Sequence, residues 1–124
     1  MMPEKFGYVI NRLATFIDPS KGDFYYMRGT SRRDSQDYEG AIDDFTEAIS
    51  INPKDYDAYN NRCITRYYLG LFKDALLDCD KANQLKPNNP THLFNRSLPK
   101  MELGDWIGAC QDLKNAASLG HQAS

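Results

Sequence analysis

Apolar residues in this chain recur every three or four positions, and the pattern itself then repeats further along. Residues 38–49 show this spacing, which places their apolar side chains on one face of a helix. The same pattern returns over 72–82 and again over 106–117. Prolines mark the repeat at steps of 34 residues: Pro19, Pro53 and Pro87. A fixed period of this length predicts stacked supersecondary units rather than one globular core.

Each unit has the signals of two helices. Asp or Asn precedes a helix as its N-cap, and Gly follows the first helix of a pair as a C-terminal cap. These residues are Asp37, Asp55, Asn89 and Asp105 at the starts, and Gly70 and Gly104 at the ends. We therefore expect an all-α fold of antiparallel helix pairs. Residues 5–18 match only the second helix of a unit, which gives about seven helices in all.

The predicted boundaries place a half-repeat helix in 1–21 and full repeats in 22–55, 56–89 and 90–123, as one domain. When the three units are aligned at the 34-residue step, several aligned positions, or columns, follow a common pattern. They read Tyr25, Tyr59 and Leu93; Gly29, Cys63 and Ser97; Ala41, Ala75 and Ala109; Phe45, Cys79 and Leu113; Ala48, Ala82 and Ala116; Pro53, Pro87 and His121. In these columns the chain resembles the tetratricopeptide repeat family. The resemblance implies a right-handed helical-repeat solenoid that binds other proteins as a scaffold or adaptor.

The resemblance also implies that the first helix of each pair lines a concave groove. The side chains placed there are Tyr26, Thr30, Arg33, Asn61, Ile64, Tyr67, Tyr68, Phe94, Asn95, Leu98 and Met101. We expect the amides of Asn61 and Asn95 to bond the backbone of an extended partner peptide. Tyr67, Tyr68 and Phe94 are the expected anchors, because Tyr is enriched in interface hot spots. The alternative is that part of this set packs the first helices together.

Comparison with one known variant of the family narrows the class of partner that this chain is expected to bind. Some members hold the C-terminal carboxylate of a heat-shock chaperone in a clamp of Lys, Arg and Asn. The matching positions here are Tyr26, Thr30, Asn61, Thr91 and Asn95, and only Asn61 agrees. Because a carboxylate needs cationic donors to offset the loss of its hydration, the sequence argues against a chaperone-tail adaptor.

Charged residues also follow the period. Each first helix carries a pair of cations four residues apart that recurs at the 34-residue step, and each second helix carries an Asp that recurs at the same step. The sets are Arg28, Arg32 and Asp44; Arg62, Arg66 and Asp78; Arg96, Lys100 and Asp112. One interpretation is a basic ladder for an acidic partner. We favour internal ion pairs, because the Arg fork matches a carboxylate on a packed neighbouring helix.

Composition excludes several classes of function. The net charge of −2 does not favour nucleic acid, and no apolar run is long enough for membrane insertion. Cys63, Cys79 and Cys110 are an odd set without a CxxC motif, so we expect inert core thiols in an intracellular, cytoplasmic protein. His92 and His121 have neither a paired nucleophile nor metal-ligand spacing. We therefore predict no catalytic site, no metal and no cofactor.

A second hypothesis is self-assembly. The predicted half-repeat would expose apolar side chains at one end of the stack: Phe6, Val9, Ile10, Leu13 and Phe16. The last helix, from Trp106 to Leu119, would expose apolar side chains at the other end. Two apolar ends on one solenoid could pair and give a homo-oligomer or a head-to-tail fibre.

Overall fold

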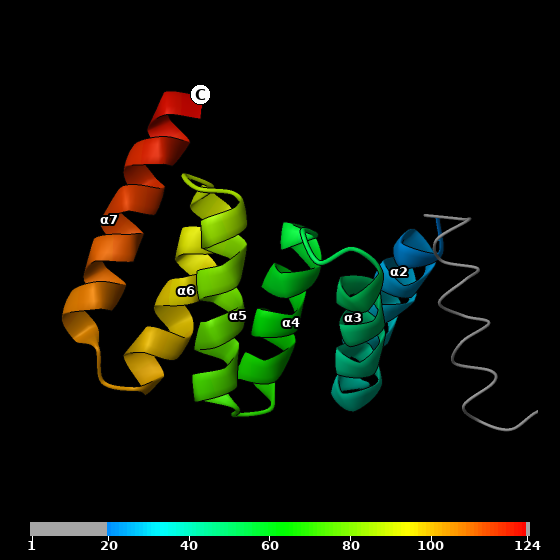
Figure 1. The fold of residues 1–124 in the computed structure, drawn as a ribbon. Helices are drawn as coiled ribbons and strands as arrows, with labels where there is room; N and C mark the ends of the chain where they lie inside the picture. Colours follow the sequence, from blue (N-terminus) through cyan, green and yellow to red (C-terminus); the bar gives the residue numbers. More distant parts are fainter. Residues whose placement is uncertain (1–19, 124) are drawn as a thin grey trace, which may run out of the picture.

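The computed structural model describes residues 20–123 and shows six helices in that range, without strands. They are α2 (Ser20–Asp34), α3 (Tyr38–Ile51), α4 (Tyr56–Tyr68), α5 (Phe72–Leu85), α6 (Pro90–Glu102) and α7 (Trp106–Ala123). Figure 1 shows them as successive hairpins standing side by side in a row, with α7 at one end. The expected all-α repeat architecture is confirmed over this range. The helix predicted for residues 5–18 lies outside the described residues.

Contacts between helices separate the molecule into two layers. Within the described residues, α2 contacts α4 and α4 contacts α6, whereas α3, α5 and α7 make no contact with one another. Each helix also packs against its neighbours in the chain, with the closest association inside the pairs α2–α3, α4–α5 and α6–α7. The first helices therefore form a continuous inner layer, and the second helices are spread apart as an outer layer.

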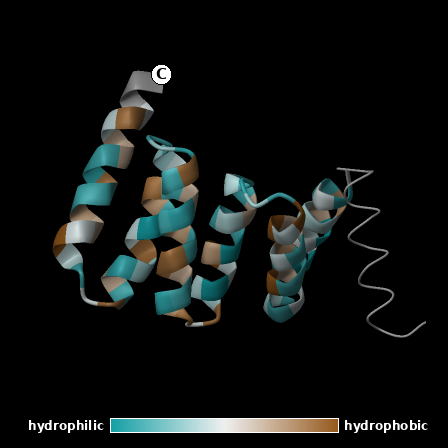
Figure 2. Ribbon diagram, viewed as in Figure 1, coloured by the Kyte–Doolittle hydropathy of each residue, from teal (hydrophilic) through white to brown (hydrophobic). Residues whose placement is uncertain are grey.

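Small residues form the contact between the two layers. Ala41, Ala48, Ala75 and Ala82 are completely buried. The largest completely buried side chain is Phe45, which packs against Gly29 of α2 so closely that a Cβ atom at Gly29 would lie 2.9 Å from its ring. Helices this close need small partners, because interiors are packed without spare volume. Figure 2 shows that the helices carry both hydrophobic and hydrophilic residues.

The helices begin at capping side chains, and two of them are followed by glycine, as the sequence predicts. The carboxylate of Asp37 accepts a hydrogen bond from the Gly40 amide at 3.1 Å, and that of Asp55 accepts one from Ala58 at 3.1 Å. Asn89 and Asp105 make the same kind of contact at the starts of α6 and α7. After α4 and α6 the chain passes through a left-handed conformation at Gly70 and Gly104. Glycine adopts this conformation without the steric cost that a Cβ atom brings.

The first repeat departs from this rule at Gln36, which has a φ of 67° at the position equivalent to Gly70. Gln36→Gly should raise the free energy of unfolding by about 0.5–1 kcal/mol, since a side chain in this region costs about 1–2 kcal/mol and the greater chain entropy of Gly offsets part of the gain. Urea unfolding checks the value. Gln36→Ala keeps a Cβ atom, so it should give no gain; an equal gain in both variants would contradict the steric explanation.

Candidate interaction surface

The residues expected to line the groove all lie on the three helices of the inner layer. We call this set the inner face: Tyr26, Thr30, Arg33, Asn61, Ile64, Tyr67, Tyr68, Phe94, Asn95, Leu98 and Met101. Tyr68 and Phe94 are the most open members, with 57% and 50% of their surfaces exposed. The others are half-buried. The inner face thus combines a few open aromatic rings with partly covered polar and apolar side chains.

A hydrogen-bonded network joins α2 to α4 across the inner face. The Asn61 amide donates to the Tyr26 hydroxyl at 3.1 Å and to the Asp57 carbonyl at 2.8 Å, while its oxygen accepts from Arg33. Burial and the nearby Asp57 carboxylate raise the pKa of Tyr26, so this hydroxyl stays protonated near neutral pH. Asn61 is therefore a structural link between repeats.

Asn95 forms the equivalent link between α4 and α6. Its amide nitrogen donates to the side-chain oxygen of Asn60 at 3.0 Å. Asn60 itself is buried. The two amides expected to bond a peptide backbone thus already bond the inner layer, which matches the alternative that part of the set packs the first helices together. Peptide binding by Asn61 and Asn95 remains a prediction.

Aromatic rings cluster where α4 ends. Tyr68 stacks on Tyr38 with 5.5 Å between the ring centroids, and Tyr67 lies 5.9 Å from Tyr68 and 5.7 Å from Phe72. Tyr67 also packs against the buried cluster of Cys63, Ala75 and Cys79. These contacts hold both tyrosines in place, so little conformational entropy remains to be lost if a partner covers them.

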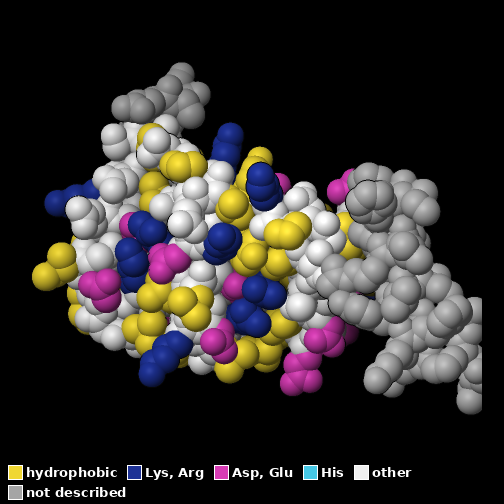
Figure 3. Space-filling view, viewed as in Figure 1, with side chains coloured by type: hydrophobic (Ala, Val, Ile, Leu, Met, Phe, Trp, Pro, Cys, Tyr) yellow, Lys and Arg dark blue, Asp and Glu magenta, His cyan; other side chains and the backbone are white. Residues whose placement is uncertain are grey.

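The periodic charges form ion pairs inside each repeat, as predicted. In the second repeat, Asp78 accepts two hydrogen bonds from the Arg62 guanidinium at 2.9 and 2.8 Å and a third from Arg66 at 2.6 Å. Asp44 is held in the same way by Arg28 and Arg32, and Asp112 by Arg96 and Lys100. The three carboxylates are buried. Figure 3 shows positive, negative and hydrophobic side chains interspersed over one side of the molecule, without a continuous basic surface.

Asp112 shows how these pairs tolerate burial. Burial by itself opposes ionisation of the Asp112 carboxyl, but the hydrogen bonds from Arg96 and Lys100 outweigh that effect and lower its pKa. The same hydrogen bond raises the pKa of Arg96. The pair therefore stays charged at neutral pH and fixes α6 against α7.

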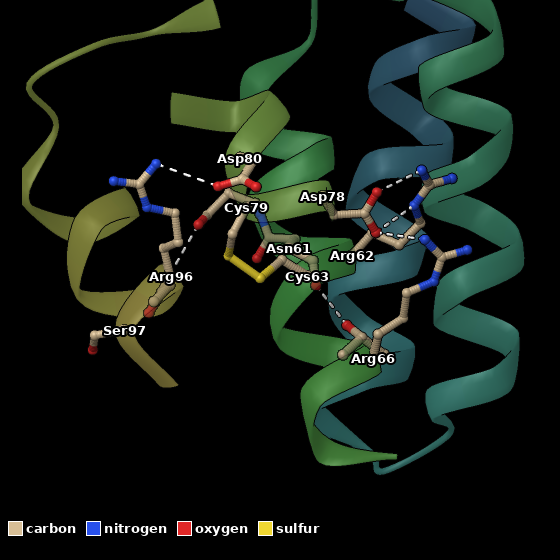
Figure 4. The surroundings of a disulfide bond; sticks show 12 residues. Asn61, Arg62, Cys63, Arg66, Asp78, Cys79, Asp80, Arg96 and Ser97 are labelled. Atoms are coloured by element: carbon tan, nitrogen blue, oxygen red, sulfur yellow. Dashed lines mark hydrogen bonds and ion pairs between the residues drawn. A yellow bond between two sulfur atoms is a disulfide. The ribbon is translucent and has the colours of Figure 1, made fainter. Parts of the chain in front are cut away.

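The expectation of inert core thiols is wrong for two of the cysteines. Cys63 of α4 and Cys79 of α5 form a disulfide bond, with their Cα atoms 5.4 Å apart (Figure 4). Figure 4 shows the bond bridging two helices beside the Asp78 ion pairs. The two residues occupy the places that Gly29 and Phe45 hold in the first repeat, where the helices touch. Because disulfides persist in oxidising surroundings, the cysteine argument for a reducing compartment no longer holds, and a cytoplasmic location remains a proposal.

Cys110 also differs from the expectation, because it is a free, exposed thiol on α7. His92 is buried with its ring 5.7 Å from that of Tyr56, and burial lowers its pKa, so it behaves as a neutral packing residue. The part of the chain that the structure describes holds no group of three or more His, Cys, Asp or Glu placed to bind a metal. None of its helices combines the length and the hydrophobicity needed to cross a bilayer.

Comparison with known proteins agrees with this architecture. The family model described as tetratricopeptide repeat matches residues 22–55. A DnaJ homolog subfamily C member 7 homolog of Dictyostelium discoideum is 33% identical over an alignment of 89 residues that covers 68% of this chain and 16% of that protein. Hsp70-Hsp90 organizing protein 2 of Arabidopsis thaliana is 38% identical over 72 residues, or 58% of this chain and 13% of that protein. The chain thus spans less than a fifth of these relatives.

Solved structures share the fold. The TPR domain of Arabidopsis OM64 superposes with a TM-score of 0.78 at 26% identity, covering 82% of this chain and 84% of that one. The first TPR of Spaghetti (RPAP3), bound to the HSP90 peptide SRMEEVD, gives a TM-score of 0.80 at 22% identity, covering 82% of this chain and 81% of that one. Together with the repeated helix pairs and the matching residue columns, these similarities show that the chain belongs to the tetratricopeptide repeat family.

Proposed function

We propose that this module is a non-enzymatic scaffold or adaptor that binds an extended segment or a helix of a partner protein across the inner face. The observation that supports this most directly is the exposure of Tyr68 and Phe94 on neighbouring helices of the inner layer. Large aromatic rings on a surface are costly to leave in water and are typical anchors of interfaces. The chain also resembles an Hsp70-Hsp90 organizing protein and a repeat domain solved with a bound peptide.

We further propose that the partner is not a chaperone tail held by its carboxylate. Asn61 is the one residue of the expected clamp that is present, and its amide is already bonded to Tyr26 and Arg33. Tyr26, Thr30, Thr91 and Asn95 offer no positive charge at the other clamp positions. The peptide SRMEEVD, bound by Spaghetti (RPAP3), is therefore the first ligand to test, and we expect calorimetry to detect no binding. Binding that a peptide amidated at its C-terminus loses would contradict this proposal.

The aromatic anchors can be tested once a peptide ligand has been selected from a displayed library. Tyr67→Ala with Tyr68→Ala should weaken the peptide's affinity at least about tenfold, because truncating a hot-spot aromatic costs about 2 kcal/mol or more. Calorimetric titration gives the affinity, and circular dichroism should show unchanged helical content.

Two further variants separate binding from stability. Tyr67 packs on the buried cluster around Cys63, so its truncation can also loosen the repeat. Phe94→Ala removes a half-exposed ring and should weaken binding without that complication. Leu77→Ala removes an apolar side chain that is more exposed still, at 67%, from α5 in the outer layer and serves as the control. Equal affinities for Phe94→Ala and Leu77→Ala would exclude the inner face as the binding surface.

Self-assembly through the ends of the stack is the second candidate. The observation in its favour is the exposure of Trp106 and Ile107 on α7. A second copy that continued the solenoid would place its own α2 on α7. By the spacing seen inside the chain, the second copy's Arg28 would then face Lys114, and the two cations would repel each other. We therefore rank partner binding above self-assembly.

A further inference from the structure

Both junctions between described repeats use the same polar contact. At the first, Arg62 of α4 donates through Nη1 to the Thr46 hydroxyl of α3 at 3.1 Å. At the second, Arg96 of α6 donates through Nη1 to the Asp80 carboxylate of α5 at 3.3 Å. In each case the Arg lies 16 residues after its acceptor. At both junctions, the second helix of one repeat thus provides an acceptor, and the first helix of the following repeat provides an Arg that donates to it.

Lys114 holds the equivalent position on α7, one period of 34 residues after Asp80. An ammonium group has three donors and no acceptor, so it cannot receive a guanidinium. No acidic side chain in the described part of the chain lies within ion-pair distance of Lys114. The third junction position is therefore a donor where the first two are acceptors.

The face of α7 around Lys114 is open. Within the described residues α7 contacts α6 alone. Trp106 and Ile107 are 64% and 84% exposed. The residues equivalent to Trp106 on the other outer helices, Tyr38 and Phe72, are half-buried. A shallow hollow of about 650 Å³ runs along this face, lined by Trp106, Ile107, Cys110, Gln111, Lys114 and Asn115.

One position on this face is apolar here although it is charged in the other repeats. At the position of Ile107, α3 carries Glu39 and α5 carries Lys73. An exposed Ile next to an exposed Trp forms an apolar patch of the kind that marks an interaction site. In the described part of the chain, this face therefore joins an apolar patch to Lys114, a cation about two helical turns further along with no acidic partner there.

We propose that the outer face of α7 docks an amphipathic helix of a partner protein that carries Glu or Asp where α4 and α6 carry Arg62 and Arg96. The occupant is a helix because the equivalent faces of α3 and α5 each receive one. Its acidic residue follows from Lys114, since opposite charges are favoured at a partly desolvated contact and like charges exclude the wrong partner. This surface is separate from the inner face.

A grafted helix provides the test. Residues 122–124 are replaced by a second copy of residues 88–103, so that the copied Arg falls 16 residues after Lys114. Three grafts carry Arg, Gln or Glu at that position. Because each grafted helix is covalently linked to the chain, it is present beside α7 at a high effective concentration. Trp106, the single tryptophan, reports docking by a shift of its emission to shorter wavelength.

We expect the Glu graft to melt at least about 3 °C above the Arg graft and to show the larger emission shift. In a Lys114→Glu background the order should reverse, with the Arg graft the more stable. Equal midpoints in both backgrounds would overturn the charge preference. Unchanged Trp106 emission in all three grafts would show that the face does not receive a helix. An ungrafted chain that forms a dimer in light scattering, and a tighter dimer after Lys114→Glu removes the repulsion with the second copy's Arg28, would assign the face to a second copy.

Discussion

Asp78→Asn should lower the free energy of unfolding by about 3 kcal/mol, the range measured when one partner of a buried ion pair is removed. Asp78 receives three hydrogen bonds from Arg62 and Arg66, whose side chains are 13% and 23% exposed. An amide has no negative charge to offset them and presents one oxygen where the carboxylate presents two. The two guanidinium groups would then remain close together and partly desolvated. Urea unfolding followed by circular dichroism measures the change.

The other repeats provide graded controls. Asp44→Asn should cost less than Asp78→Asn, because Arg28 and Arg32 are 41% and 38% exposed and can turn to water. Asp43→Asn removes the same charge from the neighbouring, exposed position of α3 and should change stability by less than about 0.5 kcal/mol. Equal losses for Asp78→Asn and Asp43→Asn would show that the buried ion pairs do not stabilise the repeat.

The repeat architecture could be predicted from sequence because the information is local and occurs three times. The 3.6-residue spacing defines each helix, and side-chain caps such as Asp55 and Asn89 define where a helix begins. The ion pairs were predictable for a related reason. Once two helices of a unit are known to pack, Arg62 and Asp78 have a fixed relation, and charge complementarity selects the partner.

The disulfide could not be predicted in this way. Cys63 and Cys79 are 16 residues apart on different helices, without a spacing motif. Their proximity depends on the small distance between α4 and α5, which the alanines of the interface set. The equivalent positions hold Gly29 and Phe45 in the first repeat and Ser97 and Leu113 in the third. From the repeat pattern alone, the two cysteines therefore look like ordinary packing residues.

The inner face was only partly predictable as well. Sequence register places Asn61 and Asn95 on the inner helices, but it does not show that Tyr26 and Asn60 lie within hydrogen-bond distance of them. Such contacts depend on how tightly successive repeats approach, a long-range property of the stack. For this reason the aromatic anchors carry the binding proposal, and the amides connect the repeats.

Reduction of the Cys63–Cys79 bond should lower the free energy of unfolding by about 3 kcal/mol, as expected for a cross-link that closes a loop of this length. The bond restricts the unfolded chain and joins the two helices of the middle repeat. That repeat contacts both of its neighbours, so its stability is shared with them through the interfaces. The measurement is urea unfolding with and without a phosphine reductant, in a Cys110→Ser background that prevents cross-linking between molecules.

A matched variant isolates the bond from the reductant. Cys63→Ala with Cys79→Ala, in the same background, removes the cross-link permanently, so its stability should not depend on the reductant. The loss of two hydrogen atoms in the intact mass of the parent chain confirms that the bond has formed. If that oxidised chain then unfolds at the same urea concentration with and without reductant, the bond does not stabilise the middle repeat, and packing between α4 and α5 must supply that stability alone. A loss near 3 kcal/mol in the parent and none in the variant would assign it to the covalent link between the two helices.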